Sequence, residues 1–210
     1  MDESCSESRP LVLASASPRR RGYLHQLGYT FAEVSPVMVE TPRANESALE
    51  YVLRNARDKA AEVAARVSPE AVIVAADTVV VREGRIMEKP ASADGARQML
   101  RALSGQTHQV ITGVCVRGKA RDGVETIRDF SVTTDVEFKE LCAAEIEAYI
   151  ESGEPLDKAG AYAIQGRAAY MIRQIRGSYT NVVGLPLTEL EEVLSQQFGI
   201  HPTFCGSAGA

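Results

Sequence analysis

A short segment near the start of the chain, residues 11–21, combines residue types that suit anion binding. Its apolar run is followed by two serines, a proline and three consecutive arginines. Pro18 can occupy the first turn of a helix, which would place Arg19 and Arg20 near the N-terminus of that helix. Free backbone N–H groups and the helix dipole attract phosphate there, and arginine adds bidentate hydrogen bonds. The alternative is that Arg19, Arg20 and Arg21 are solvated charges on an ordinary helix.

Asp77 is the second candidate, because its carboxylate directly follows the apolar run of residues 71–76. A run that is apolar on both faces is typical of a strand in the middle of a sheet. We expect Asp77 at the carboxyl end of that strand, where α/β proteins bind ligands. A buried, ionised aspartate is costly unless it is paired, hydrogen-bonded or bound to a metal. The alternative is an aspartate that caps a turn.

Two lysines could add positive charge. Lys59 falls at the border of the apolar face of a helix that we predict from Ser47 onwards, so it can bury its stem and still present its ammonium. Pro90 keeps Lys89 extended, although on its own Lys89 is better explained as a charge on a surface loop. Because the three histidines are isolated in the sequence, acid/base chemistry falls to carboxylates and lysines.

Gln165 lies in an irregular segment, residues 153–166, that contains three glycines and a proline. Loops of this kind often line sites, but they are also commonly plain turns. The amide of Gln165 offers a donor and an acceptor suited to the edge of a nucleobase. The neighbouring Asp157 and Lys158 can simply pair with each other.

Strands and helices alternate around these residues. The strand patterns cover residues 11–13, 29–34, 71–76, 109–116, 130–138 and 170–175. The helical patterns begin near Pro18 and Ser47, cover residues 93–103 and 143–150, and end with a helix after a capping box of Thr188 and Glu191. We therefore predict an α/β fold, with a mixed, elongated β-sheet flanked by helices and two lobes around a central cleft.

Composition narrows the function classes. The net charge of −5 over 210 residues argues against a nucleic acid polymer as the main partner. No apolar run approaches the roughly 20 residues of a membrane span, and the acidic start lacks a signal-peptide pattern, so we expect a cytoplasmic protein without membrane contact. The four scattered cysteines suggest neither a zinc site nor disulfides. We expect one domain over residues 10–199, with disordered tails over residues 1–9 and 200–210.

Taken together and in order, the motifs resemble the Maf family of nucleoside triphosphate pyrophosphatases. The matching segments are Ser15–Arg20, Glu40, Arg57–Ala60, Ala76–Val80, Glu88–Pro90, Leu103–His108, Gly153–Tyr162 and Gly177–Pro186. The resemblance implies a fold similar to that of the inosine triphosphate pyrophosphatases. It also implies hydrolysis of a nucleoside triphosphate between its α and β phosphates, with a divalent metal cation, Mg²⁺ or Mn²⁺.

The resemblance also assigns residues. Asp77 matches the family's catalytic proton acceptor, and Arg19, Thr78 and Gln165 match positions that set base specificity. The other matching site positions, for phosphate and metal, are Ser15, Ser17, Arg20, Glu40, Lys59 and Lys89. The implied metal ligands are Glu40 and Asp77, and which of them serves metal or water stays open. Many relatives have an acidic residue just before the matching glutamate, whereas residues 37–39 here are Val-Met-Val.

The resemblance is closest to the branch of the family that acts on dTTP and UTP, because of Thr78 and Gln165. One alternative is a pyrophosphatase for 7-methyl-GTP or another modified nucleotide. A second is a non-catalytic regulator, since the family was first associated with inhibition of septum formation. The sequence leaves open whether the chain forms a homodimer.

Overall fold

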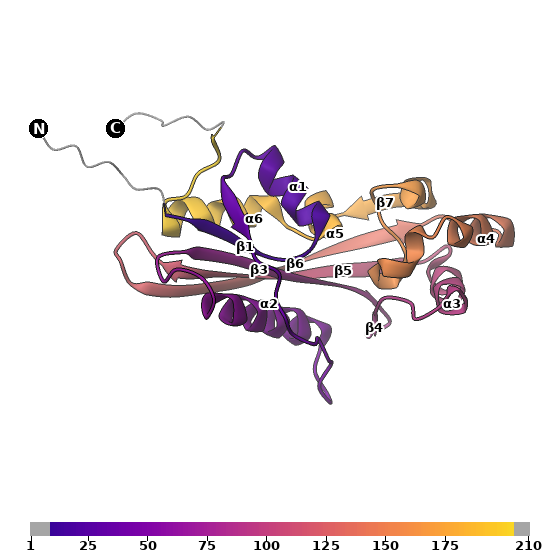
Figure 1. Ribbon diagram of the computed structural model, residues 1–210. Helices are drawn as coiled ribbons and strands as arrows, with labels where there is room; N and C mark the ends of the chain where they lie inside the picture. The colour runs from indigo at the N-terminus through magenta and orange to yellow at the C-terminus, as the bar shows by residue number, and fades with distance from the viewer. Residues whose placement is uncertain (1–8, 204–210) are drawn as a thin grey trace, which may run out of the picture.

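A computed structural model describes residues 9–203, which form one mixed sheet of seven strands with helices on its faces (Figure 1). The strands are β1 (Leu11–Ala14), β2 (Phe31–Glu33), β3 (Val72–Arg82), β4 (Arg85–Met87), β5 (Thr107–Lys119), β6 (Glu125–Phe138) and β7 (Ile172–Arg176). Their order is β2-β1-β3-β5-β6-β7, and β4 pairs with β3 outside this path. β1 is parallel to both β2 and β3, whereas all other pairs are antiparallel. The predicted mixed α/β sheet is therefore confirmed.

Local sequence signals account for where the main helices begin. The helices are α1 (Pro18–Gln26), α2 (Ala48–Ala64), α3 (Ala93–Leu103), α4 (Ala143–Glu151), α5 (Tyr179–Val183) and α6 (Leu187–Val193). Short turns of helix add η1 (Glu154–Asp157), η2 (Ala159–Ala161), η3 (Arg167–Met171) and η4 (Leu194–Phe198). Ser17 caps α1 just before Pro18, and Ser47 forms the predicted capping box with Glu50 at the start of α2.

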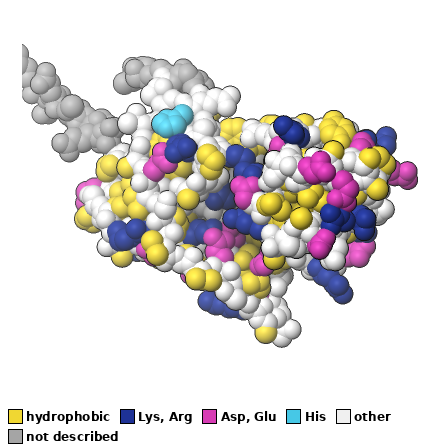
Figure 2. Space-filling view, turned by 45° about the vertical axis from the view of Figure 1, so that its right-hand side comes forward, with side chains coloured by type: hydrophobic (Ala, Val, Ile, Leu, Met, Phe, Trp, Pro, Cys, Tyr) yellow, Lys and Arg dark blue, Asp and Glu magenta, His cyan; other side chains and the backbone are white. Residues whose placement is uncertain are grey.

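One edge of β3 is only partly paired, and this opens a gap in the middle of the sheet. β1 pairs with Val72–Ala75, and β4 pairs with Val80–Arg82. Residues 76–79 therefore have a strand neighbour, β5, on one side only. The space-filling view shows a hollow near the middle of the molecule, surrounded by basic and acidic side chains (Figure 2). The backbone polar groups of this gap that face away from β5 need partners from outside the sheet.

Gly113 allows α2 to lie close to the sheet beside this gap. It is the β5 residue directly opposite Asp77 in the register. A Cβ atom on Gly113 would lie 2.6 Å from the backbone carbon of Val52 in α2, so any side chain there would push the helix away. The glycine thus brings the polar side chains of α2 within reach of Asp77.

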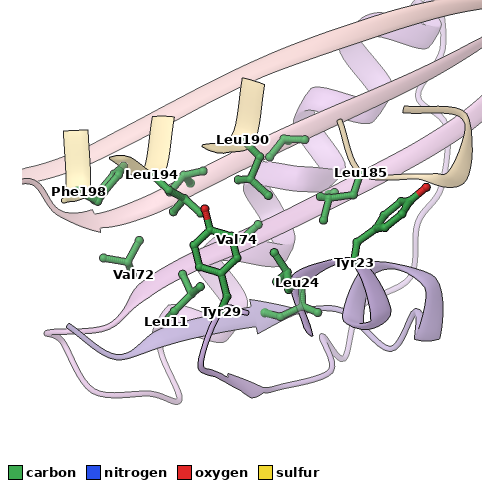
Figure 3. Close-up of a cluster of buried hydrophobic side chains, with 14 of the residues drawn as sticks. Leu11, Tyr23, Leu24, Tyr29, Val72, Val74, Leu185, Leu190, Leu194 and Phe198 are labelled. Atoms are coloured by element: carbon green, nitrogen blue, oxygen red, sulfur yellow. The ribbon is translucent and has the colours of Figure 1, made fainter. Parts of the chain in front are cut away.

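The core is divided into clusters that belong to two lobes. One cluster lies between the sheet and the helices α1 and α6, and its labelled members include Leu11, Leu24, Val74, Leu190 and Leu194 (Figure 3). On the opposite face, α2 packs against alternate residues of β1 and β3. A separate cluster joins α3, α4 and the short helical turns to the other end of the sheet. α3 and α4 lie at the end of the molecule opposite to α6 (Figure 1).

The structure corrects several predicted boundaries. β3 continues to Arg82, so Asp77 lies in the middle of the strand and not at its carboxyl end. The two polar residues after the apolar run, Asp77 and Thr78, suggested that the strand ends there. They continue it because both side chains have hydrogen-bond partners inside the fold. β4 and α5 were not predicted, and both hairpin strands are longer than their apolar patterns. The predicted capping box at Thr188 is wrong, because α6 begins at Leu187 after Pro186 and already includes Thr188.

Packing continues somewhat beyond residue 199. Ile200 contacts the cluster under α6, and Pro202 is buried. The rest of the two predicted tails, residues 1–8 and 204–210, lies outside the described residues. Within the described part of the chain, no helix is both long enough and apolar enough to cross a membrane.

Candidate active site

A cleft of about 730 Å³ lies at the free edge of β3, between the two lobes. Its lining contains every site residue selected from the sequence. These residues are Ser15, Ser17, Arg19, Arg20, Glu40, Lys59, Asp77, Thr78, Lys89 and Gln165. They come from segments far apart in the chain, so the fold brings the whole predicted set to one place.

Asp77 is the most deeply placed carboxylate of this set, with 6% of its surface exposed. It projects from the face of β3 that α2 covers. Asn55 donates a hydrogen bond to Oδ2 of Asp77 over 2.8 Å, and the Lys59 ammonium lies 2.8 Å from Oδ1. The buried charge of Asp77 is thus both paired and hydrogen-bonded.

Lys59 also contacts Glu40 and thereby joins two acidic groups. Its Nζ atom lies 2.8 Å from Oε1 of Glu40, on the segment between β2 and α2. The same ammonium donates to the Ala76 carbonyl over 3.4 Å and so satisfies part of the unpaired β3 edge. Lys59 is buried although it is charged, because three acceptors surround it.

The surroundings shift the pKa values of the two carboxyl groups in opposite directions. Burial acts to raise the pKa of Asp77, but the Lys59 charge and hydrogen bonds from Lys59 and Asn55 outweigh it, so this pKa lies below its ordinary value. Burial and the Asp77 charge raise the pKa of Glu40. The charged form is therefore favoured at Asp77 and disfavoured at Glu40, and a proton acceptor must be ionised.

Thr78 lies next to Asp77 in the chain but points to the opposite face of the sheet, as successive strand residues do. Its hydroxyl accepts a hydrogen bond from Arg20 over 3.0 Å and lies 2.9 Å from the hydroxyl of Thr112. Thr112 donates to the Asn181 carbonyl, so Thr78 is the donor toward Thr112. A chain of hydrogen bonds therefore runs from Arg20 across the sheet to Asn181.

Arg20 is held by the protein itself. Its guanidinium donates to the carbonyls of Gly184 and Ala76, both over 2.8 Å, and to the hydroxyls of Ser15 and Thr78. These bonds use four of the five N–H groups of an arginine. Arg20 thus supplies hydrogen bonds to the unpaired edge of β3 from the face of the sheet opposite to Lys59. The sequence did not predict this structural role.

The remaining predicted residues occupy the walls of the cleft. Ser17 caps α1, and Ser15 accepts a hydrogen bond from the Ser17 amide over 3.1 Å, so both serines shape the turn before α1. Arg19 donates to the Val183 carbonyl over 3.4 Å and is only partly buried. Lys89 and Gln165 line the cleft from segments that lead into the other lobe.

Arg21 does not belong to this lining. Its side chain is about half exposed and pairs with Glu33 over 3.3 Å. The three neighbouring arginines therefore have different surroundings. Arg20 is hydrogen-bonded inside the protein, Arg19 lies on the cleft wall and Arg21 extends into solvent.

The sequence interpretation missed Asn55, although a signal for it was present. Asn55 is fully buried and lies four residues before Lys59, so both side chains share one face of α2. The signal in the sequence is this spacing of two polar side chains on one helix face, and the structure shows that both contact Asp77. Tyr51 also lines the cleft from the same helix.

The acidic groups of the cleft match the way in which proteins hold magnesium. Among residues 9–203, no group of three or more histidine, cysteine or acidic side chains is arranged to hold a metal ion. Glu40 and Asp77 instead offer two carboxylates that share one cation, Lys59. Mg²⁺ is commonly bound by one or two carboxylates together with substrate phosphates. The donor set therefore fits a metal ion whose remaining ligands come from outside the protein.

Sequence comparison assigns the family. The family of Maf-like proteins matches residues 10–197. The chain belongs to the Maf family. The dTTP/UTP pyrophosphatase of Salmonella typhimurium is 51% identical over 185 residues, which are 88% of this chain and 91% of that relative. The dTTP/UTP pyrophosphatase of Vibrio cholerae is 50% identical over 186 residues, which are 88% of this Maf chain and 96% of that relative.

Solved structures show a weaker likeness to this Maf protein. The Ham1 protein of Staphylococcus aureus is 15% identical, with a TM-score of 0.43 over 61% of this chain and 71% of that chain.

Proposed function

We propose that this protein hydrolyses dTTP and UTP to the nucleoside monophosphate and pyrophosphate. The observation that carries this proposal is the buried Asp77 carboxylate, which Lys59 and Asn55 hold ionised at the base of a cleft rich in basic groups. Relatives about half identical to this chain are named dTTP/UTP pyrophosphatases, which supports the choice of substrate. We also propose that the protein acts in the cytoplasm, where its nucleotide substrates are found.

The charges of the cleft suit a polyphosphate. A nucleoside triphosphate carries about four negative charges, which must be neutralised before water can approach phosphorus. Three separate segments of the chain supply positive charge to the cleft lining, through Arg19, Lys59 and Lys89. We assign phosphate binding to Arg19 and Lys89, and to Lys59 once a metal ion replaces it between Glu40 and Asp77. The Arg19 amide in the first turn of α1 adds a backbone donor, because the Ser17 and Arg20 amides already donate to serine hydroxyls and Pro18 has no N–H. The main role of Arg20 is structural, because its hydrogen bonds hold Gly184, Ala76 and Thr78 in place on the cleft wall.

Asp77 is the proposed proton acceptor. Its low pKa keeps it ionised near neutral pH, so it can orient a water molecule and accept its proton as the water attacks phosphorus. Glu40 and Asp77 would hold Mg²⁺ or Mn²⁺. When bound, the cation lowers the pKa of water and stabilises the charge of the pyrophosphate leaving group.

Base choice is assigned to Arg19, Thr78 and Gln165. Gln165 lines the cleft and carries an amide that can donate and accept at the edge of a pyrimidine. The Thr78 hydroxyl is already bonded to Arg20 and Thr112. We therefore propose that Thr78 influences base choice through the position of Arg20 and of the loop at Gly184, without touching the base.

The test is the release of pyrophosphate from a panel of triphosphates, each with and without Mg²⁺. We expect dTTP and UTP to be cleaved with the highest kcat/KM, and dCTP to be the informative comparison because it has the same size with a different pattern of donors and acceptors. Faster cleavage of 7-methyl-GTP than of dTTP and UTP would contradict the assigned substrates. No pyrophosphate from any triphosphate would contradict the proposed activity itself.

A further inference from the structure

The segment that carries Gln165 is held on both sides by two side chains outside the cleft lining. On one side, the Ala163 amide donates to the hydroxyl of Tyr149 over 3.3 Å. On the other side, the Arg167 amide donates to Oε2 of Glu154 over 3.2 Å. Tyr149 lies in α4 and Glu154 begins η1. Gln165 therefore lies between two fixed points of the backbone.

The two holding side chains are themselves joined. The Tyr149 hydroxyl donates to Oε1 of Glu154 over 3.0 Å. Tyr149 is buried, and burial together with the hydrogen bond to Glu154 raises its pKa, so its hydroxyl keeps the proton that it donates. The hydrogen bonds thus run in one direction from Ala163 through Tyr149 to Glu154, while Arg167 approaches the other carboxylate oxygen. We call Tyr149 and Glu154 the clamp.

Gly166 fits the clamp in a way that a larger residue could not. Its φ of 115° lies in the range that favours glycine. A Cβ atom on Gly166 would also lie only 2.7 Å from Oε1 of Glu154. The Glu154 carboxylate therefore occupies the space beside the glycine backbone. This close approach fixes the direction in which the chain passes from Gln165 to Arg167.

We propose that Tyr149 and Glu154 are positioning residues, which hold the Gln165 amide ready to recognise the base. This inference rests on the proposed function, in which Gln165 reads the pyrimidine. Neither clamp residue belongs to the cleft lining, so both act through the segment from Ala163 to Arg167. A loop that is already ordered spares the cost of immobilising its side chains when the substrate binds.

The expected signature is a change in KM and in base choice with kcat retained. Freezing a side chain costs about 0.5–1.5 kcal/mol, which corresponds to a factor of about 2 to 10. We expect Glu154→Ala and Tyr149→Phe to raise KM for dTTP by about that factor. We also expect the ratio of kcat/KM for dTTP to that for dCTP to fall similarly, with kcat for dTTP changed less than about twofold. Glu154→Gln keeps one acceptor oxygen and should restore part of the ratio.

The test compares these variants with Gln165→Ala and with the double variant Glu154→Ala/Gln165→Ala. If the clamp acts through Gln165, the double variant has the same ratio as Gln165→Ala alone, because the two effects are not additive. Glu151→Gln is the matched control, since Glu151 is an exposed carboxylate at the end of α4, and it should behave as the wild type. Thermal unfolding of each variant checks that the fold survives.

The outcomes distinguish the positioning role of the clamp from the base-reading role of Gln165. The positioning role alone is overturned if Gln165→Ala lowers the ratio but the clamp variants leave it unchanged, or if the two effects simply add. If Gln165→Ala itself leaves the ratio unchanged, the base-reading part of the proposed function fails, and the positioning role fails with it.

Discussion

The Lys59 ammonium lies 2.8 Å from Oδ1 of Asp77, and both side chains are almost fully buried. The same ammonium lies 2.8 Å from Oε1 of Glu40, so one lysine pairs with two acidic groups. Asn55 adds a hydrogen bond to Asp77 from the preceding turn of α2. This arrangement favours the ionised form of Asp77, and it gives Lys59 two carboxyl partners that a second cation would have to share.

Replacement of Asp77 by asparagine tests the proposed proton acceptor. The amide has nearly the same shape but no negative charge, so Asp77→Asn should lose general-base catalysis, which is typically worth about 10²- to 10⁴-fold in rate. Pyrophosphate release measures kcat, and circular dichroism confirms that the fold survives. Asp58→Asn is the control, because Asp58 is an aspartate about half exposed on α2, and it should retain wild-type activity.

Undiminished activity of Asp77→Asn would remove this carboxylate from the mechanism. The same variant tests a separate role in cell division. Any effect of the protein on septum formation should disappear with catalysis, and an effect that persists in the inactive variant would favour a binding role.

Lys59→Met tests whether the lysine competes with a metal ion for the two carboxylates. Without the ammonium, Glu40 and Asp77 lack their shared positive partner. We expect the nucleotide-free variant to bind Mn²⁺ about tenfold more tightly, a gain of about 1.4 kcal/mol. Electron paramagnetic resonance of free Mn²⁺ during a titration measures this affinity. Lys89→Met serves as a control from the other wall of the cleft, and an unchanged or weaker affinity of Lys59→Met for Mn²⁺ would argue against competition.

Arg20→Met and Arg21→Met should differ strongly in stability although the residues are neighbours. Arg20 donates to two backbone carbonyls and two hydroxyls inside the protein, and leaving such buried acceptors unpaired should lower the free energy of unfolding by about 2–4 kcal/mol. Arg21 forms one exposed ion pair, so its loss should change stability by less than about 0.5 kcal/mol. Urea unfolding measures both values, and equal losses would show that Arg20 does not anchor the β3 edge.

His108 should make stability depend on pH between about 4 and 6.5. Burial, with the nearby Arg82 charge, lowers the pKa of His108 from 6.5 to about 4. The unfolded chain therefore binds a proton in this range that the folded protein does not. The contribution of neutral His108 to the free energy of unfolding is fully present above pH 6.5. It falls as the pH decreases toward 4, by up to about 1.4 kcal/mol per pH unit. Urea unfolding of the wild type and of His108→Gln measures the difference, and identical pH profiles would exclude His108 as its source.

Much of the architecture could be predicted because its causes are local in the sequence. Ser17 and Pro18 mark the start of α1, and the Ser47–Glu50 pair marks the start of α2 through contacts within one turn. The apolar patterns of the strands identified the mixed sheet. The motifs, together with their resemblance to the Maf family, also identified the cleft set, all of which the structure places in one lining.

Only the tertiary structure decided which partners each of these residues contacts. Asp77 and Thr78 are neighbours in the chain, but the alternation of the strand sends one toward α2 and the other toward Arg20. Arg20 reaches Gly184, 164 positions away, and Lys59 joins Asp77 to Glu40 across a gap in the pairing of β3. The sequence by itself determined which chemical groups are available. Their partners, burial and charge depend on contacts between distant segments, which no local pattern contains.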